Sequence, residues 1–217
     1  MDTNLLNQQS QHWETNFSNK PEMFGLEASV AAIKSLKIFK KNNINKIVEL
    51  GAGLGRDTIY FAQNSIKCEA LDYSPSAIKN IILKSKQKKI SDFVNAKIFD
   101  IRQKLPFEDS TIEACYSHML YCMALSNNDI QNLNKEIKRV LKPGGVNVFT
   151  VRNTFDGDYK NGIHRGEDLY ENNGFIVHYF SKSKINSLLE GFDNLVTENF
   201  DEGSFPRKLF FVCNKKI

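Results

Sequence analysis

A glycine-rich turn directly after an apolar run is the feature that most constrains the fold of this chain. Residues 45–50 (NKIVEL) are typical of a buried strand, and Gly51-Ala52-Gly53-Leu54-Gly55 separates them from a helical pattern at about 57–64. Glycines in such a turn let the backbone approach a ligand that a Cβ would obstruct. A second apolar run, 66–72, ends in Asp72, 21 residues after Gly51, the spacing at which a carboxylate grips ribose hydroxyls. The segment therefore predicts a nucleotide-binding strand–helix–strand unit.

The same alternation of short apolar runs with longer helical patterns continues through the middle of the chain. The pattern predicts a helix over 75–88, strands near 93–99 and at 111–117, a helix over 128–141 and a strand over 146–152. Ser74-Pro75 suits a helix start, because the missing N–H of proline costs nothing there, and Pro143-Gly144-Gly145 suits a helix end. Continuous apolar strands separated by helices predict an α/β fold, with a mostly parallel, doubly wound sheet covered on both faces.

The last third of the chain follows a different pattern. A helix at 181–189 precedes two strand-like runs, 194–200 and 208–214, which are joined by a loop containing Gly203 and Pro206. Because no helix separates these two runs, we expect an antiparallel edge pair that completes a seven-stranded, Rossmann-like sheet. The polar segment 153–177 is predicted to be a functional or disordered loop, because connections of this length are uncommon in compact domains.

Two helices are predicted ahead of the first strand. Residues 26–41 form the more regular one, with a row of apolar positions at Leu26, Val30, Ile33, Leu36 and Phe39, and residues 3–19 form the other. We expect one domain over 1–217, with a helical cap at 1–42, a cofactor-binding half at 43–152, and a substrate loop with the C-terminal strands at 153–217.

Composition and charge exclude several classes of protein. Hydrophobic residues make up 41% of the chain and charged residues 25%, which is ordinary globular composition. The net charge is +4, with 23 Lys against 6 Arg, less positive and poorer in arginine than nucleic-acid binders usually are. No run approaches the roughly 18 apolar residues of a membrane span, and the first residues do not resemble a secretory signal. We therefore expect a cytoplasmic protein.

The four cysteines, Cys68, Cys115, Cys122 and Cys213, do not follow a zinc-binding spacing. Three of them lie in apolar strand-like runs, which favours buried reduced thiols and no metal site. Cys122 is different because it follows the end of a predicted strand.

The glycine spacing narrows the choice of nucleotide. A dinucleotide site uses G-x-G-x-x-G/A to seat a pyrophosphate, but here the third glycine comes one residue early, and Arg56 stands where the third small residue belongs. Glu49 precedes Gly51 by two residues, where its carboxylate would repel a pyrophosphate and suit a cationic ligand. A G-x-x-x-x-G-K-[ST] phosphate loop does not occur in the sequence.

With these residues in place, ELGAGLG followed by Asp72 resembles the cofactor motif of class I S-adenosylmethionine-dependent methyltransferases. Further matches across 45–152 are Asp100-Ile101, the stretch Leu105-Pro106-Phe107-Glu108-Asp109 before TIEACYSHML, and Leu141-Lys142-Pro143-Gly144-Gly145. A weaker resemblance, through Trp13 and Phe24-Gly25, is to small-molecule methyltransferases of the tellurite-resistance and thiopurine type. One departure is Glu113, which stands where many members have Asp.

The resemblance implies S-adenosylmethionine as the cofactor and assigns residues to it. Glu49 and the Gly51–Gly55 backbone would face the methionine moiety, Asp72 the ribose, and Asp100 with Ile101 the adenine. Tyr73 would stack on the adenine or else stay an exposed aromatic residue. The predicted cofactor set is Glu49, Gly51, Ala52, Gly53, Gly55, Arg56, Asp72, Tyr73, Asp100, Ile101 and Ser117.

A small-molecule acceptor is expected near the end of the fourth strand. His118 is a candidate general base, with a cofactor contact or a packing role as its alternative. His164 is a second candidate, against a solvated surface loop. The remaining candidates for the acceptor pocket are Trp13, Phe24, Tyr121, Cys122, Arg152, Asn153, Asp158, Tyr159, Arg165, Glu167, Asp168 and His178. We expect the 153–177 segment to form part of this pocket.

Other functions compete with this one. A nucleic-acid methyltransferase usually carries an N/D-P-P-Y/F-type motif or a Pro-Cys pair after the fourth strand, where this chain has SHMLYC. A non-catalytic S-adenosylmethionine-binding module is a second alternative. The glycine spacing disfavours a dehydrogenase. Methylation of arsenic or tellurium compounds through Cys122 has thin support.

Overall fold

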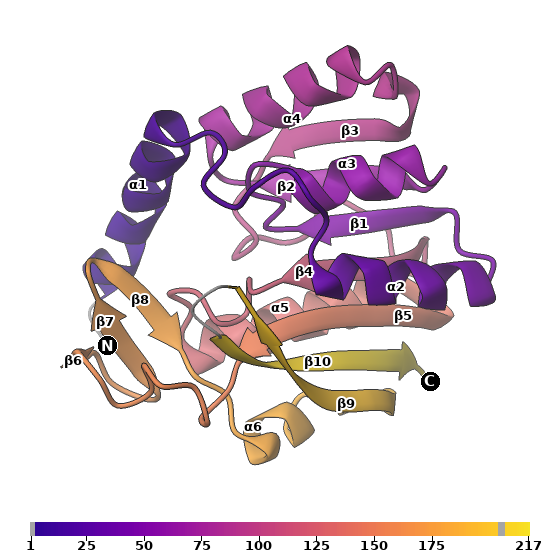
Figure 1. The fold of residues 1–217 in the computed structure, drawn as a ribbon. Helices are drawn as coiled ribbons and strands as arrows, with labels where there is room; N and C mark the ends of the chain where they lie inside the picture. The colour runs from indigo at the N-terminus through magenta and orange to yellow at the C-terminus, as the bar shows by residue number, and fades with distance from the viewer. Residues whose placement is uncertain (1–2, 204–206) are drawn as a thin grey trace.

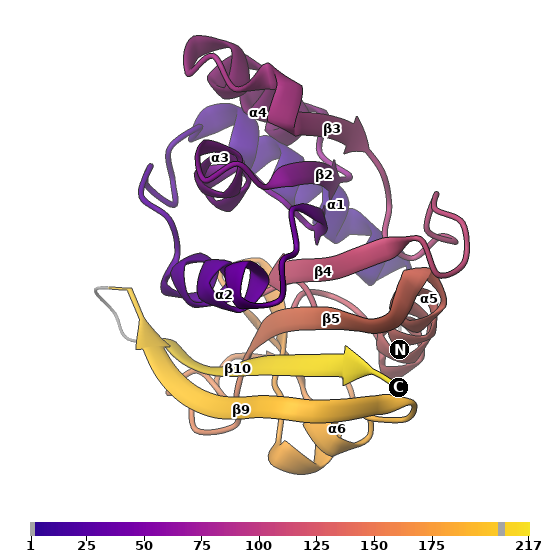
Figure 2. The ribbon, with the colours of Figure 1, turned by 90° about the vertical axis from the view of Figure 1, so that its right-hand side faces the viewer.

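The computed structural model describes residues 3–203 and 207–217, and its centre is a seven-stranded sheet in the order β3-β2-β1-β4-β5-β10-β9. Figure 2 shows this order from β3 at one edge to β9 at the other. The first five strands run parallel, and β10 is antiparallel to both β5 and β9, which confirms the predicted fold. The strands are β1 Lys46–Leu50, β2 Lys67–Asp72, β3 Val94–Ile98, β4 Ile112–His118, β5 Leu141–Arg152, β9 Phe192–Glu202 and β10 Arg207–Lys216.

Helices cover both faces of the sheet. Their bounds are α1 Thr3–Asn19, α2 Val30–Lys41, α3 Arg56–Gln63, α4 Pro75–Gln87, α5 Asn127–Val140 and α6 Lys182–Asn186. Successive strand residues point to opposite faces, so Ile47 packs with α2 and α3 while Val48 packs with α5 and α6. Strand order reverses between β2 and β4, on either side of β1, the position at which open α/β sheets bind ligands.

Local sequence signals place several helix starts. Ser74 caps α4 by accepting a hydrogen bond from the Ala77 N–H, and Pro75 follows as predicted. Ser126 begins α5 with a capping box closed by Asp129.

The helix predicted over 26–41 begins later, at Val30. Ser29 has an extended backbone (φ −64°, ψ 155°), and its side chain accepts from the Ala32 N–H, so the helix cannot extend back past this cap. Leu36 and Phe39 are buried as expected. Leu26, Val30 and Ile33, however, are 61%, 42% and 42% exposed, so most of the predicted apolar positions face solvent.

The segment 153–177, predicted as a loop, contains most of a second, three-stranded sheet. Its antiparallel strands are β6 Ile163–His164, β7 Leu169–Asn172 and β8 Phe175–His178. Strands of two to four residues are too short to show an alternating pattern, so they could not be predicted from the amino-acid sequence. The helix predicted at 181–189 shortens to α6, while the two C-terminal strands extend beyond 194–200 and 208–214.

Helix α1 stands across the carboxyl ends of the parallel strands, with the small sheet β6–β8 beside it (Figure 1). It packs against α4 on one side and against β8 on the other. Among the residues described, no helix has both the length and the hydropathy needed to cross a bilayer.

Candidate functional site

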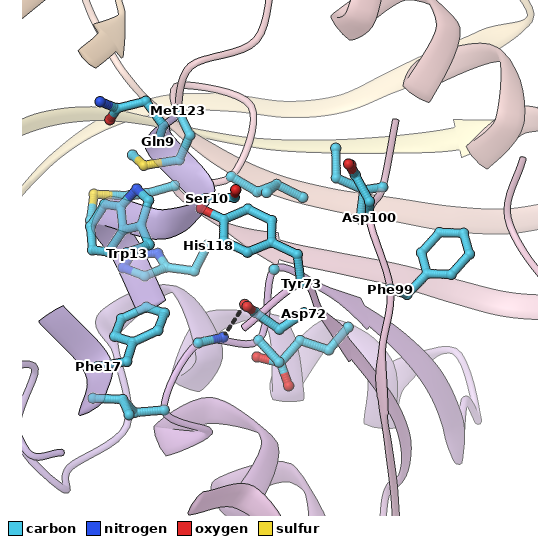
Figure 3. A pocket seen from close by; sticks show the side chains of 18 of the residues that line it. Gln9, Ser10, Trp13, Phe17, Asp72, Tyr73, Phe99, Asp100, His118 and Met123 are labelled. Carbon is cyan, nitrogen blue, oxygen red and sulfur yellow. Dashed lines mark hydrogen bonds between the residues drawn. The ribbon is translucent and has the colours of Figure 1, made fainter. Parts of the chain in front are cut away.

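A cleft opens between α1 and the carboxyl ends of β1, β2 and β4. It holds about 1210 Å³ of empty space, its mouth included. Figure 3 shows Gln9, Trp13, Phe17, His118 and Met123 on one side and Asp100 with Phe99 on the other, with Tyr73 and Asp72 between them. The predicted residues that line this cleft are Trp13, Phe24, Glu49, Gly51, Ala52, Gly53, Gly55, Arg56, Asp72, Tyr73, Asp100, Ile101 and His118.

The glycine turn forms one wall of the cleft. Gly51 and Gly53 have left-handed backbones (φ +67° and +52°), which favour glycine. A Cβ on Gly51 would lie 2.7 Å from Leu120 Cδ1, whereas a Cβ on Gly53 would meet nothing nearer than Phe17 Cζ at 3.6 Å. The turn is therefore packed tightly against the loop after β4 at Gly51 and is open at Gly53.

Asp72, at the end of β2, joins the turn to the start of α4. Its Oδ2 accepts from the Gly53 N–H (2.8 Å) and its Oδ1 from the Ser74 N–H (2.9 Å). Burial raises the pKa of Asp72 to about 6, against the effect of these two hydrogen bonds, and the nearby charge of Glu14 adds to the rise. Each oxygen has a second lone pair, so the carboxylate can still accept two hydroxyl groups.

Two further carboxyl groups lie beneath the turn. Burial, and then the charge of Asp57, raise the pKa of Glu49 well above its usual range, although Thr58 Oγ1 donates to it (2.5 Å). Asp57 accepts from the Ser29 N–H (2.8 Å) and from the hydroxyl of Tyr116 (2.8 Å). Sequence reasoning missed Asp57, which is buried at the start of α3 and ties that helix to α2. A cationic ligand group above this acidic floor would offset the repulsion between the carboxyl groups and favour the ionised form of Glu49.

Asp100 faces an arginine that the sequence analysis did not single out. Arg102 Nε lies 3.0 Å from Asp100 Oδ1, and Arg102 Nη2 lies 2.6 Å from Oδ2. Burial acts to raise the pKa of Asp100, but the hydrogen bonds and charge of Arg102 outweigh it and hold the pKa below its usual value. Arg102 Nη1 also donates to Asn7 Oδ1 of α1 (2.6 Å), so this ion pair ties α1 to the end of β3.

His118 lines the cleft with both ring nitrogens facing protein partners. Nδ1 lies 2.9 Å from Thr150 Oγ1, and Nε2 lies 3.0 Å from Glu202 Oε2 on β9. The Thr150 hydroxyl also accepts from the Met119 N–H (2.9 Å), so it ties the ring to the backbone after β4. Nε2 is buried, and its contact with Glu202 lacks the geometry of a hydrogen bond.

Glu202 is a second residue that sequence reasoning missed. It lies in β9, 84 positions after His118, and it also contacts Arg56 Nη2 (3.3 Å). Burial acts to raise its pKa, but hydrogen bonding and the charges of His118 and Arg56 hold the pKa below its usual value. No local pattern signals this contact, because it depends on how the C-terminal hairpin crosses the site.

Helix α1 supplies the wall opposite the strands. Trp13 packs against Phe17, Phe24 and Phe175, with ring centroids 5.3, 6.2 and 4.9 Å away. Leu6, Gln9 and Ser10 complete this wall and were not predicted, although Leu6, Gln9, Trp13 and Phe17 follow helical spacing on one face.

Three polar side chains of α1 hold the helix in place. Glu14 accepts hydrogen bonds at the start of α4 from the hydroxyls of Ser74 and Ser76 (2.5 Å for Ser76) and from the Ser76 N–H (3.2 Å). Burial acts to raise the pKa of Glu14, but these bonds outweigh it and lower the pKa. Gln9 donates to Gly174 O (2.9 Å) and accepts from the Ile176 N–H (3.2 Å), while Asn7 binds Arg102.

The remaining predicted residues do not line the cleft. They are Ser117, Tyr121, Cys122, Arg152, Asn153, Asp158, Tyr159, His164, Arg165, Glu167, Asp168 and His178. Tyr121 is buried against Phe149, with ring centroids 4.5 Å apart. Arg152 binds Asp156 and Asp158, and Arg165 binds Glu171, so both guanidinium groups are engaged elsewhere. His164 stacks on Tyr170 at an exposed position.

His178 and Glu167 support the cleft from behind. The backbone N–H of His178 donates to Cys122 O (2.9 Å), and the Nδ1 atom of its ring donates to Leu125 O (2.7 Å). The carboxylate of Glu167 accepts from the Asn127 N–H (2.8 Å). The 153–177 segment and His178 thus support α1 and the loop 119–127, and both of these line the cleft. The segment itself does not line the cleft, contrary to the prediction. Burial, and then the charge of Lys184, lower the pKa of His178 to about 4, so the buried ring is neutral at pH 7.

Comparison with known proteins gives one family and a set of similar proteins. Residues 48–149 match the family model described as a methyltransferase domain. The chain is 31% identical over 156 residues to sterol 4-C-methyltransferase strm-1 of Caenorhabditis elegans, covering 69% of this chain and 45% of that protein. It is 31% identical over 121 residues to phosphoethanolamine N-methyltransferase 1 of Triticum aestivum, covering 54% of this chain and 24% of that protein. The chain thus spans less than half the length of either relative.

A similar solved structure is 1,6-didemethyltoxoflavin-N1-methyltransferase of Burkholderia thailandensis, with bound 1,6-didemethyltoxoflavin and S-adenosylhomocysteine. The TM-score is 0.74 at 14% identity, and the match covers 96% of this chain and 87% of that one. At this identity the likeness concerns the fold alone.

Proposed function

We propose that this chain, whose residues 48–149 match a methyltransferase domain, transfers a methyl group from S-adenosylmethionine to a small-molecule acceptor. The observation that carries the proposal is the hydrogen bond from the Gly53 N–H of the glycine turn to the Asp72 carboxylate. A buried carboxylate with spare lone pairs stands there beside a backbone that is open to a ligand.

The residues present fit S-adenosylmethionine. Glu49 and the open turn at Gly53 would hold its methionine end, where the acidic floor suits a cationic group. Asp72 would accept the ribose hydroxyls, and Tyr73 with Ile101 would border the adenine. Asp100 is engaged by Arg102, so we assign it the role of shaping the adenine end through that pair. When bound, S-adenosylmethionine supplies an electrophilic methyl group that the lone pair of an acceptor can displace in line.

The part played by this chain in the reaction is placement. Holding two reacting groups in line at contact distance removes much of the entropic barrier of a bimolecular step. His118 Nδ1 is bonded to Thr150 and its Nε2 is buried against Glu202, and His164 lies outside the cleft lining. We therefore propose no general base from either histidine, and His118 acts as a fixed part of the wall held by Thr150 and Glu202.

Alternatives from other classes have less support. Cys122 is buried outside the cleft, and burial raises the pKa of its thiol to about 11, which disfavours a thiolate route to metalloid compounds. Both arginines that line the cleft are paired with carboxylates, which does not favour phosphate groups of a nucleic acid.

Calorimetry tests the cofactor, and methyl transfer tests the activity. We expect S-adenosylhomocysteine to bind and NAD(H) to give no measurable heat, because the early third glycine and Glu49 disfavour a pyrophosphate. Methyl-labelled S-adenosylmethionine, incubated with the protein and a small-molecule extract, should then label a small product. Cofactor binding without any transfer would favour the non-catalytic alternative.

A further inference from the structure

We infer that the acceptor enters the cleft on the α1 side as an uncharged molecule with an apolar body. This inference rests on the proposed function and goes beyond it by naming the class of acceptor. It is carried by the state of the polar and charged side chains around the cleft, nearly all of which are already paired.

The wall on the α1 side is apolar and rich in rings. Trp13 and Phe17 of α1 come together there with Phe24, and Met123 lies on the same side (Figure 3). Leu6, Met119, Ala124 and Leu125 extend this lining. When an apolar body packs against such a wall, the apolar surfaces of both are removed from water, which favours binding.

The cations of the described lining are engaged with carboxylates. Arg56 contacts Glu202 (3.3 Å) and donates to Phe24 O (3.1 Å). Arg102 is held by Asp100 (2.6 Å). An anionic acceptor, such as one that carries a phosphate group, would have to break one of these pairs or lose its hydration without a partner.

The neutral polar side chains of the α1 side are also committed. Gln9 uses both ends of its amide on Gly174 and Ile176, and the hydroxyl of Ser10 donates to Asn7 O (2.9 Å). His118 Nδ1 is bonded to Thr150, and its Nε2 is buried in contact with Glu202. This side of the cleft therefore has little with which to compensate a charge taken out of water.

Amine chemistry leads to the same conclusion. A protonated amine has no lone pair with which to attack a methyl group, and His118 is not arranged to remove its proton. An amine acceptor would therefore have to enter in its neutral form. Of the acceptors in the names of the two relatives, the sterol is of the class that fits this lining, and phosphoethanolamine is not.

Three probes with one body and different charges test the inference. Naphthalene-2-methanol, naphthalene-2-carboxylate and naphthalene-2-methylammonium would each be titrated by calorimetry at pH 7.5 into protein saturated with S-adenosylhomocysteine, with phosphoethanolamine as a fourth ligand. We expect the alcohol to bind at least about tenfold more tightly than either ion, and phosphoethanolamine to bind more weakly still. Equal or tighter binding of an ion or of phosphoethanolamine, or no binding of the alcohol, would overturn the inference.

Variants locate the probe. Trp13→Ala should weaken the alcohol at least about fivefold and leave S-adenosylhomocysteine within about threefold, and Phe24→Ala should act in the same direction. Phe155→Ala is the matched control, because that ring is 65% exposed and outside the cleft lining, and it should change neither affinity. An alcohol that binds all variants equally would contradict the assigned wall. Failure of the wild-type protein to bind S-adenosylhomocysteine would instead contradict the proposed function.

Discussion

Leu120 Cδ1 lies 2.7 Å from the place where a Cβ on Gly51 would stand, so the loop after β4 rests directly on the glycine turn. The turn is thereby held from the side of the fourth strand as well as from its own flanking strand and helix. Gly25, which also lines the cleft, has a similar left-handed backbone (φ +72°) but open space where its Cβ would be.

Replacing each glycine by alanine separates backbone strain from crowding. Gly25→Ala should cost about 1–2 kcal/mol of unfolding free energy, the usual penalty for a left-handed residue with a Cβ. Gly51→Ala carries the same penalty plus overpacking against Leu120, so we expect about 2–5 kcal/mol. Urea unfolding curves measure both values. Equal losses in the two variants would mean that Leu120 moves aside freely.

The fold was predictable because its signals are local. The run 45–50, the glycine turn and Asp72 lie within 28 residues, and the apolar runs that follow are long enough to identify parallel strands. The 153–177 segment was mispredicted because its strands have two to four residues, and their order comes from pairing with one another and from packing on α1. Residues 26–29 follow helical spacing, but the N-cap at Ser29 makes the helix begin only at Val30.

The site was predictable only on the cofactor side. Glu49, Asp72 and their neighbours follow strand ends directly, and parallel strand ends meet at one edge of a sheet. Glu202 and Arg102 are held at the site by contacts with residues far away in the sequence, and the spacing of residue types does not predict such contacts. His178 was placed in the acceptor pocket as a polar residue near a loop, but β8 turns it onto Leu125 O instead.

Asp72 is predicted to dominate ribose recognition. Asp72→Ala would leave the ligand hydroxyls without their acceptor, a loss of about 1–3 kcal/mol, so the Kd for S-adenosylhomocysteine should rise about tenfold or more. Asp92→Ala, at an exposed position outside the cleft, is the control. An unchanged Kd in a folded Asp72→Ala protein would remove Asp72 from the binding site.

Cofactor affinity should also depend on pH, because burial raises the pKa of Asp72 from 3.8 to about 6. Hydroxyl groups bind an ionised carboxylate more strongly than a protonated one, so the affinity for S-adenosylhomocysteine should fall about tenfold between pH 7.5 and 5. The folding stability of the ligand-free protein depends on pH in the opposite direction. The stabilising contribution of Asp72 is fully present below about pH 4 and is lost as the pH rises through about 6. Calorimetry across this range, with Asp72→Asn for comparison, should give a flatter profile for the variant.

Glu14 is predicted to fix α1 to α4. Glu14→Ala removes the acceptor for the hydroxyls of Ser74 and Ser76, and we expect a loss of about 1–3 kcal/mol. Because Trp13 is the single tryptophan of the chain, its fluorescence should shift to the red as α1 loosens. Glu108→Ala, which alters an exposed glutamate away from α1, should change neither signal.

His178 is predicted to hold the loop after β4. His178→Phe keeps a ring but removes the donor to Leu125 O, leaving a buried carbonyl unpaired at a cost of about 1–3 kcal/mol. Amide hydrogen exchange within 119–127 should therefore accelerate. His178→Asn places an amide N–H near the former Nδ1 and should restore part of the protection. Identical exchange in the wild-type protein and the phenylalanine variant would contradict this role.

The contacts of Gln9 have a consequence for how the chain folds. Gln9 is bound to Gly174 and Ile176, residues 165 and 167 positions away along the chain. During synthesis α1 leaves the ribosome before the central sheet, yet Gly174 and Ile176 are made only after the parallel strands β1–β5 are complete. Closing so long a loop is slow and entropically costly, so the central sheet can assemble before α1 is attached to β8. Helix α1 can meet α4 earlier through Glu14, but its contacts with β8, and with them that side of the cleft, form only near the end of folding.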